Sequence, residues 1–216
     1  MIIAIDGPSG SGKSTLGRML ARALKLLYID TGSMYRAVAL ATIDAEIDPG
    51  DKDAVTALAE EIEIDLRGDP DSLSVLLNGH DVTEKIRTES VTEMSSVVST
   101  IPGVRRAMVE RQRAFGKRGA VLNGRDIGTV VFPDADVKFF LTAAAEERAE
   151  RRYKEDQITK ASSATFAETL ADMIERDGRD SSRADSPLKV ADDAIVIDST
   201  GKNIDEVFEE MMSRIN

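Results

Sequence analysis

The chain of 216 residues contains no cysteine and a single histidine, His80. The absence of cysteine excludes a disulfide framework and a thiolate metal site, and it suits the reducing cytoplasm, where we expect this protein to work. His80 follows Asn78-Gly79, the preferred dipeptide of a tight hairpin turn. We expect an ordinary surface residue there and therefore no Ser-His-Asp triad.

Long apolar runs are also missing, since none approaches the roughly 20 residues that a membrane-spanning helix needs. We expect no signal peptide either, because residues 1–5 are typical of a strand and no basic segment precedes them. The formal net charge of −11 argues against non-specific binding of nucleic acids. We therefore expect neither a membrane nor a nucleic acid as partner.

The composition that remains is ordinary for a globular protein, with 42% hydrophobic and 31% charged residues. A chain of this length can bury one substantial core and carry a small inserted lobe. Its basic residues are concentrated in residues 105–118 and 148–183. Arginine-rich segments in an acidic protein indicate that charge gathers around a small polyanionic ligand.

Residues 1–15 hold the strongest motif. An isoleucine-rich run over residues 1–5 predicts a buried strand, and residues 7–14 then match G-x-x-x-x-G-K-S/T at every fixed position. This loop precedes an amphipathic helix, where a flexible linker would not lie, and it turns successive backbone N–H groups toward a phosphate. We expect Lys13 to reach the β- and γ-phosphates of a nucleotide and the Ser14 hydroxyl to be a ligand of Mg²⁺. The candidate phosphate-binding residues are Gly7, Pro8, Ser9, Gly10, Ser11, Gly12, Lys13, Ser14 and Thr15.

Short apolar runs separated by helical patterns make up most of the chain. After the first strand, further strands are predicted at residues 26–30, 120–123, 137–141 and 194–198. Strands separated by helices imply an α/β fold, a parallel sheet with helices on both faces. Ligands of such folds bind at the carboxyl ends of the strands. We therefore expect one edge of the sheet to gather residues 7–14, 30–32, 124–126 and 199–200.

The pattern changes between residues 62 and 82, where apolar and polar residues alternate on both sides of Asn78-Gly79. This indicates a small antiparallel sheet inserted into the alternating chain. Residues 88–116 are helical in pattern with a break at Pro102-Gly103, and further helices are predicted at residues 33–43, 53–61, 165–179 and 203–215. Residues 156–165 are polar and poor in large apolar side chains, so we expect a mobile loop there.

Several of these segments together resemble the bacterial cytidylate kinases. The segments are residues 7–15, Asp-Thr-Gly-Ser-Met-Tyr-Arg at 30–36, Gly-Arg-Asp-Ile-Gly-Thr at 124–129 with residues 130–135, and the charged run at 176–183. Their order and spacing match over the whole chain. The resemblance implies one P-loop kinase domain of three layers, with a core at residues 1–43 and 117–216 and a lid at about 154–165. The inserted segment, at about residues 44–116, resembles the nucleoside-monophosphate-binding lobe of that family.

The resemblance also implies an activity, the transfer of the γ-phosphoryl group of ATP to CMP or dCMP with Mg²⁺, and we expect a monomer. It places Arg36, Arg125 and Arg183 around the CMP phosphate, with Thr31 in the turn that lines this pocket. It assigns Ser96, Arg105 and Asp126 to the cytosine, and Arg176 and Asp180 to the ribose. The lid over the ATP phosphates would carry Arg148, Arg151 and Arg152. One departure is Asn123, which stands where many members of the family have aspartate.

Elementary chemistry agrees with a site of this composition. The acceptor of such a transfer is already an anionic phosphate oxygen, so no general base is required. The reaction needs in-line positioning and neutralisation of charge on the phosphoryl group. Lysine, a metal ion and arginines that bind phosphate oxygens in a bidentate manner supply both.

Other interpretations compete with these assignments. Arg148, Arg151 and Arg152 alternate with glutamates, so an ordinary solvated helix face would also account for them. Ser96 has a second interpretation as the cap of a turn. For the whole chain the alternatives are a P-loop kinase of UMP, AMP or shikimate, or a regulatory GTPase. A GTPase would carry an Asn/Thr-Lys-x-Asp box after a strand, and the sequence holds none.

Overall fold

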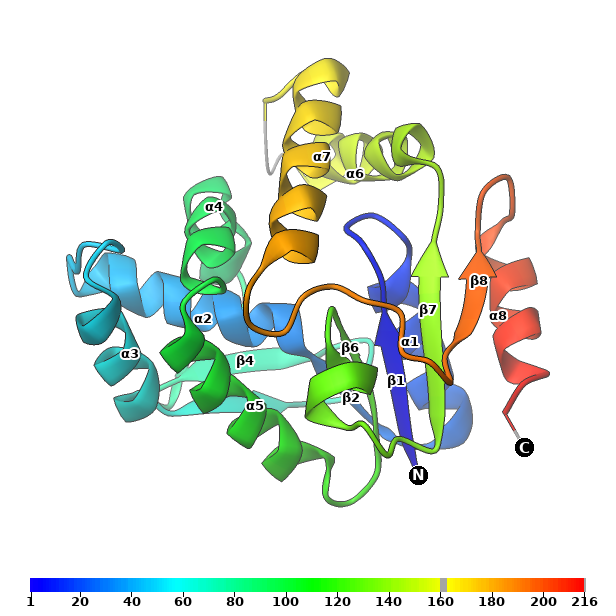
Figure 1. Ribbon diagram of the computed structural model, residues 1–216, viewed down its shortest axis with the longest axis horizontal. Coiled ribbons are helices and arrows are strands. Elements are labelled where there is room, and N and C mark those ends of the chain that lie inside the picture. Colours follow the sequence, from blue (N-terminus) through cyan, green and yellow to red (C-terminus); the bar gives the residue numbers. More distant parts are fainter. Residues whose placement is uncertain (160–162, 216) are drawn as a thin grey trace.

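The computed structural model describes residues 1–159 and 163–215, and its centre is a parallel sheet (Figure 1). The sheet has five strands in the order β2-β6-β1-β7-β8, and every neighbouring pair is parallel. The strands are β1 (Ile2–Asp6), β2 (Leu27–Asp30), β6 (Ala120–Gly124), β7 (Val137–Thr142) and β8 (Ile195–Asp198). The α/β architecture predicted from the sequence is therefore confirmed.

Each face of this sheet packs on its own hydrophobic cluster because successive side chains of a strand point to opposite faces. Ile3 and Ile5 of β1 belong to a cluster with residues of α1 (Lys13–Leu24) and α8 (Ile204–Met212). Ala4, between them, belongs to the other cluster, which includes much of α2 (Thr31–Asp44). None of the helices in residues 1–159 and 163–215 has the length and apolar character to span a membrane.

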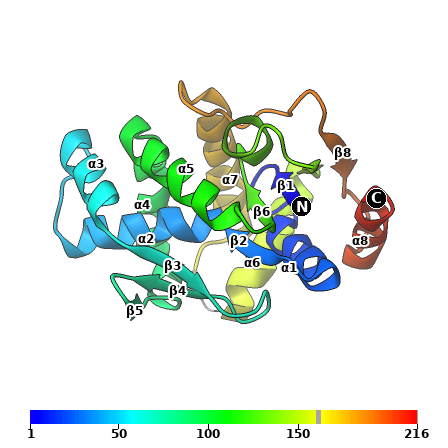
Figure 2. The ribbon, with the colours of Figure 1, turned by 90° about the horizontal axis from the view of Figure 1, so that it is seen from below.

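The inserted segment forms the predicted antiparallel sheet of β3 (Ile64–Arg67), β4 (Ser74–Leu77) and β5 (His80–Asp81). Figure 2 shows this sheet beside α2. Asn78 and Gly79 have positive φ angles of 50° and 79°, the backbone that a tight hairpin turn requires. His80 is exposed, as expected.

The inserted segment also contains helices. They are α3 (Lys52–Glu61), a 3₁₀ turn (Lys85–Arg87), α4 (Glu89–Val98) and α5 (Pro102–Gly116). The break predicted at Pro102-Gly103 is the start of α5, where proline occupies the first turn.

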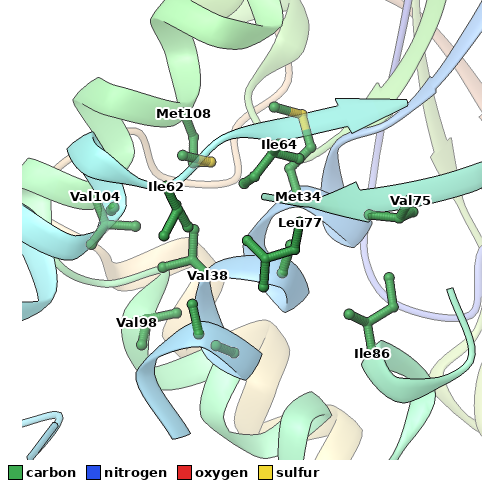
Figure 3. Close-up of a cluster of buried hydrophobic side chains, with 14 of the residues drawn as sticks. Met34, Val38, Ile62, Ile64, Val75, Leu77, Ile86, Val98, Val104 and Met108 are labelled. Atoms are coloured by element: carbon green, nitrogen blue, oxygen red, sulfur yellow. The ribbon is translucent and has the colours of Figure 1, made fainter. Parts of the chain in front are cut away.

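One hydrophobic cluster joins the inserted segment to the main sheet (Figure 3). Met34 and Val38 of α2 lie at its centre and are fully buried. The small sheet contributes Ile64, Val75 and Leu77, and the helices contribute Val98, Val104 and Met108. Burial of such side chains contributes about 1.5–3 kcal/mol each. The cluster therefore fixes the inserted segment to α2, the helix that begins at the carboxyl end of β2.

The prediction of a loop over residues 156–165 is wrong for residues 156–159, which belong to the end of α6 (Ala145–Thr159). Ion pairs between side chains four residues apart, such as Arg152 with Asp156, support a polar helix without large apolar residues. Residues 160–162 lie outside the described part, and 163–165 have no regular structure.

The C-terminal helices also differ in length from the expectation. The helix predicted over residues 165–179 is α7 (Phe166–Ser182), which carries most of the charged run at 176–183. By contrast, α8 ends at Met212, before the predicted end.

Two glycines in helices predict opposite effects of the same substitution. A Cβ added to Gly103 would lie 2.3 Å from Cγ2 of Thr56 on α3, whereas one added to Gly178 on α7 would meet nothing within 4 Å. Gly103→Ala should therefore destabilise the fold by about 1–3 kcal/mol through overpacking. Gly178→Ala should stabilise it by about 0.5–1 kcal/mol through helix propensity. Urea unfolding of both variants tests this, and shifts of equal sign would contradict it.

Candidate active site

The loop between β1 and α1 lies against the backbone of β7. Gly7 has a φ of +146°, and a Cβ added there would lie 2.1 Å from the carbonyl oxygen of Leu141. Only glycine allows the chain to leave β1 along this path. The loop ends at Gly12, which precedes the first turn of α1 and also has a positive φ, of 90°. The first turn of α1 thus follows a loop that glycine shapes, as the motif predicts.

Lys13 is buried at the start of α1. Its ammonium group donates hydrogen bonds to the carbonyl oxygen of Pro8 and to Oγ of Ser11, which lies 3.3 Å away. Burial lowers the pKa of Lys13 well below its usual value, and the positive charge of Arg125 lowers it further. A nearby anion would offset both effects. A bound phosphate would therefore stabilise the charged form of Lys13.

Arginines from separate parts of the chain meet at the same edge of the sheet. Arg36 of α2 forms an ion pair of 3.2 Å with Asp30, and Arg125 donates to Asp180 at 2.8 Å. Asp180 also pairs with Arg183, at 3.5 Å.

Arg176 of α7 faces this group. Burial and repulsion by Arg125 lower its pKa to about 10. Arg36 and Arg152 also repel Arg176, and Asp180 attracts it. Positive charge thus exceeds negative charge among these side chains.

Some guanidinium groups of this region hold buried N–H donors that make no hydrogen bond. Within residues 1–159 and 163–215, these atoms include Nε of Arg36 and Nε of Arg105, while Nη2 of Arg183 makes only its ion pair of 3.5 Å with Asp180. A buried donor that stays unpaired costs about 1–3 kcal/mol, and more where it is charged. Guanidinium donors of this kind are suited to an anion with several oxygens.

Arg105 and Asp126 form the most deeply buried ion pair of the site. Nη2 of Arg105 lies 2.5 Å from Oδ2 of Asp126, and Nη1 donates to the carbonyl oxygen of Ser99 at 3.1 Å. The guanidinium group also lies over the ring of Tyr35, 5.4 Å from its centroid. The carboxylate of Asp126 is thereby held in place beside the arginine cluster, whereas Arg125 pairs with Asp180.

The oxygen atoms at Ser14 and Asp30 are suited as ligands of a hard cation. The amide Nδ2 of Asn123 donates to Oγ of Ser14 at 3.2 Å and to Oδ1 of Asp30 at 3.4 Å. Thr31 donates to the carbonyl oxygen of Asn123 at 2.8 Å. The described residues contain no group of three or more acidic, histidine or cysteine side chains that would hold a metal alone. Mg²⁺ prefers a site in which the protein supplies few oxygen ligands, here a hydroxyl and a carboxylate, and the other coordination positions are left for substrate oxygens and water.

The arginines of α6 differ from one another in their surroundings. Arg148 is buried and donates to the carbonyl oxygen of Ser9 at 2.9 Å and to Asp177 at 2.6 Å. Arg151 donates to Oγ and to the carbonyl oxygen of Ser199, beyond β8. Arg152 pairs with Asp156 on α6 itself. The interpretation as a plain solvated face therefore does not describe Arg148.

Asp177 of α7 contacts the phosphate-binding loop itself. Its Oδ1 accepts the backbone N–H of Ser9 at 3.3 Å, while Oδ2 pairs with Arg148. A carboxylate thus occupies an N–H of the loop that is expected to bind phosphate. Figure 1 shows α6 and α7 together beyond the carboxyl ends of β1 and β7.

Hydrogen bonds and ion pairs link many of the residues singled out from the sequence, whereas the hydrogen bond of the Ser96 side chain stays within its own helix. This residue lies on α4, and its hydroxyl contacts the carbonyl oxygen of Thr92 at 3.5 Å. Sequence reasoning missed Asp6 and Asp177 as members of the site. For Asp6 the available signal was its position as a single acidic residue at the end of an apolar strand, directly before Gly7.

Comparison with known proteins assigns the chain to a family. The family model described as cytidylate kinase matches residues 3–216. The chain belongs to the cytidylate kinase family.

Curated members of this family match over nearly their whole length. The cytidylate kinase of Citrifermentans bemidjiense is 50% identical over 216 residues, which cover 100% of this chain and 92% of that protein. The cytidylate kinase of Clostridioides difficile is 46% identical, with coverage of 100% and 98%. An uncharacterised protein of known structure from Eubacterium ventriosum has a TM-score of 0.56 at 11% identity, covering 100% of this chain and 98% of that one. This last similarity concerns the fold alone.

The contact of Asp177 with Ser9 predicts a change in nucleotide affinity. Because the carboxylate competes with phosphate oxygens, Asp177→Asn should lower the Kd for ATP by about threefold to tenfold, the effect of roughly 1 kcal/mol. Isothermal titration measures the Kd. Asp172→Asn, an exposed position on the same helix, is the control and should leave the Kd unchanged. A higher Kd in Asp177→Asn would contradict competition.

Proposed function

We propose that this protein transfers the γ-phosphoryl group of ATP to CMP or dCMP, giving ADP and CDP or dCDP. The observation that carries the proposal is the buried Lys13 of the phosphate-binding loop, whose pKa is lowered by burial and further by the positive charge of Arg125 and Arg176. A site with two separate sets of phosphate donors is suited to two phosphate-bearing substrates. Membership of the cytidylate kinase family supports CMP as the acceptor.

The donor side of the proposed reaction is built by residues 7–15. Backbone N–H groups of this loop and the ammonium group of Lys13 would hold the β- and γ-phosphates. Mg²⁺ would be held by the Ser14 hydroxyl, with Asp30 next to it. Bound there, the metal ion would neutralise charge on the phosphate oxygens.

The acceptor side is built by arginines from α2, the segment after β6, and α7. Arg36, Arg125 and Arg183 would bind the phosphate of CMP, in the pocket that the turn at Thr31 lines. Arg176 and Asp180 would hold the ribose. Because the acceptor oxygen already carries charge, these residues act by in-line positioning and need no general base.

The base would be read by Asp126. Cytosine carries an exocyclic amino group, and a carboxylate accepts a hydrogen bond from it. The ion pair with Arg105 holds this carboxylate in one orientation. Arg105 and Ser96 would complete the contacts of the base, Ser96 after a change of its present contact with Thr92.

The proposed reaction also needs a site closed to water. We assign residues 1–43 and 117–216 to a core and residues 44–116 to the acceptor-binding lobe. We assign residues 154–165 to a lid, which includes the last residues of α6 and, at 160–162, residues outside the described part. Arg148, Arg151 and Arg152 would bring this lid over the ATP phosphates. Since a single chain supplies every group of this site, we propose that the protein is a monomer. We also propose that it works in the cytoplasm, whose reducing conditions suit a chain without cysteine.

A panel of acceptors tests the proposed function. With ATP and Mg²⁺, ADP release should be fast with CMP and dCMP and at least tenfold slower with UMP, AMP or shikimate. Lys13→Ala should lower kcat by about 100-fold or more, because the transferring group loses one charge partner. Lys52→Ala, an exposed lysine at the start of α3, is the matched control and should keep normal turnover. Preference for another acceptor would replace CMP in the proposal.

The selection of cytosine over uracil by the proposed site leads to a separate prediction. Asp126→Asn should narrow the ratio of kcat/KM for CMP to that for UMP, because an amide can donate to the carbonyl oxygen of uracil. In the wild type this ratio should be at least tenfold, as expected for an unpaired buried acceptor. Thermal unfolding of the variant checks that Arg105 without its partner leaves the protein folded at the assay temperature. An unchanged ratio would show that the base is read elsewhere.

A further inference from the structure

Asp6 is a buried carboxylate to which the proposed reaction assigns no role. It is the last residue of β1 and directly precedes Gly7, and its exposed fraction is 4%. Oδ1 accepts the backbone N–H of Ile127 at 2.8 Å, and Oδ2 accepts that of Gly128, also at 2.8 Å. One side chain at the start of the phosphate-binding loop thus holds two consecutive N–H groups of a different segment.

The segment that Asp6 holds begins directly after Arg125 and Asp126. Residues Ile127–Val131 form a π-helical turn whose N–H groups at 130 and 131 bond back to the carbonyl oxygen of Asp126. A Cβ added to Gly128 would lie 3.1 Å from Cδ of Lys138 and 3.4 Å from Oδ2 of Asp6. The turn is therefore packed closely against Asp6, and its position sets where the preceding side chains point.

We propose that Asp6 is a positioning residue for the acceptor: by holding the N–H groups of Ile127 and Gly128, it orients Arg125 and Asp126 toward CMP. This inference rests on the proposed function. Asp6 touches neither substrate in this scheme. It joins the donor loop to the acceptor residues through the end of β1, so that the two phosphates meet at a fixed separation.

Protonation of Asp6 offers a way to separate positioning from folding. Burial raises the pKa of Asp6 to about 6, against hydrogen bonds from Gly128 and Ile127 that lower it. The charged groups that face it are Asp126, which raises the pKa, and Lys13 of α1, which lowers it. A protonated carboxyl group turns one acceptor oxygen into a donor, so it loses one of the two N–H bonds.

Protonation of Asp6 has opposite effects on orientation and on stability, since it weakens the hold on the turn but favours the folded state. The pKa is raised above its ordinary value of 3.8, so protonation favours the folded state. The stability that Asp6 contributes is fully present below pH 3.8 and is lost as the pH rises through about 6. Acidification from pH 7.5 to 5.5 therefore strengthens the fold through this group while it weakens the orientation of the acceptor residues.

The test uses Asp6→Asn, which keeps the shape of the side chain and one acceptor oxygen. At pH 7.5 the KM for CMP should rise about tenfold, the loss expected for one charge-assisted hydrogen bond, while the KM for ATP should change less than about twofold. Asp51→Asn is the matched control, since Asp51 caps α3 through the N–H of Ala54. It should leave both KM values unchanged.

The pH profile completes the test. Between pH 7.5 and 5.5 the KM for CMP should rise more in the wild type than in Asp6→Asn, and titration of CMP itself cancels in this comparison. Equal pH profiles, or KM values for CMP and ATP that rise together, would overturn the positioning role. Should Asp6→Asn not fold, a wild-type KM for the CMP dianion that stays constant over this range would also overturn it. A wild type that phosphorylates no nucleoside monophosphate would instead refute the proposed function.

Discussion

The excess of positive charge at the carboxyl ends of the strands is the constraint on which this site depends. Arg36, Arg125, Arg176 and Arg183 approach one another with few carboxylates between them. Asp180 is shared by two of these guanidinium groups, so neither is fully neutralised. Charges that are partly buried in this way are costly unless an anion completes the set. The same cost that opposes folding is recovered when a phosphate binds.

Hydrophobic packing supplies the rigidity that holds these charges together. The cluster drawn in Figure 3 anchors α2 against the small sheet and the helices of the inserted segment. Because α2 begins at Thr31 and carries Arg36 in its second turn, the position of the inserted segment and that of an acceptor arginine are coupled. A displacement of this segment relative to the main sheet would therefore move Arg36 relative to the phosphate-binding loop.

Polar links then connect the donor and acceptor halves of the site. Asn123 links Ser14, the residue expected to bind the metal, with Asp30. Asp177 links α7 with the phosphate-binding loop at Ser9, and Asp6 links β1 with the turn after Asp126. Each link crosses between segments that are distant in the chain. They are suited to transmit the presence of one substrate to the residues that bind the other. The links of Asp177 and Asp6 end on backbone N–H groups, and that of Asn123 ends on two side-chain oxygens.

Features that depend on neighbouring residues could be predicted from the sequence: the glycine loop before Lys13, the hairpin at Asn78-Gly79 and the alternation of strands with helices. The ion pairs between segments far apart in the chain, among 28 basic and 39 acidic residues, depend on the tertiary structure. Arg105 pairs with Asp126 across 21 positions, and Arg125 with Asp180 across 55. Such pairs follow from strand order and helix packing, which local patterns do not encode. The role of Asp6 was hidden for the same reason, since its partners are backbone groups 121 and 122 positions away.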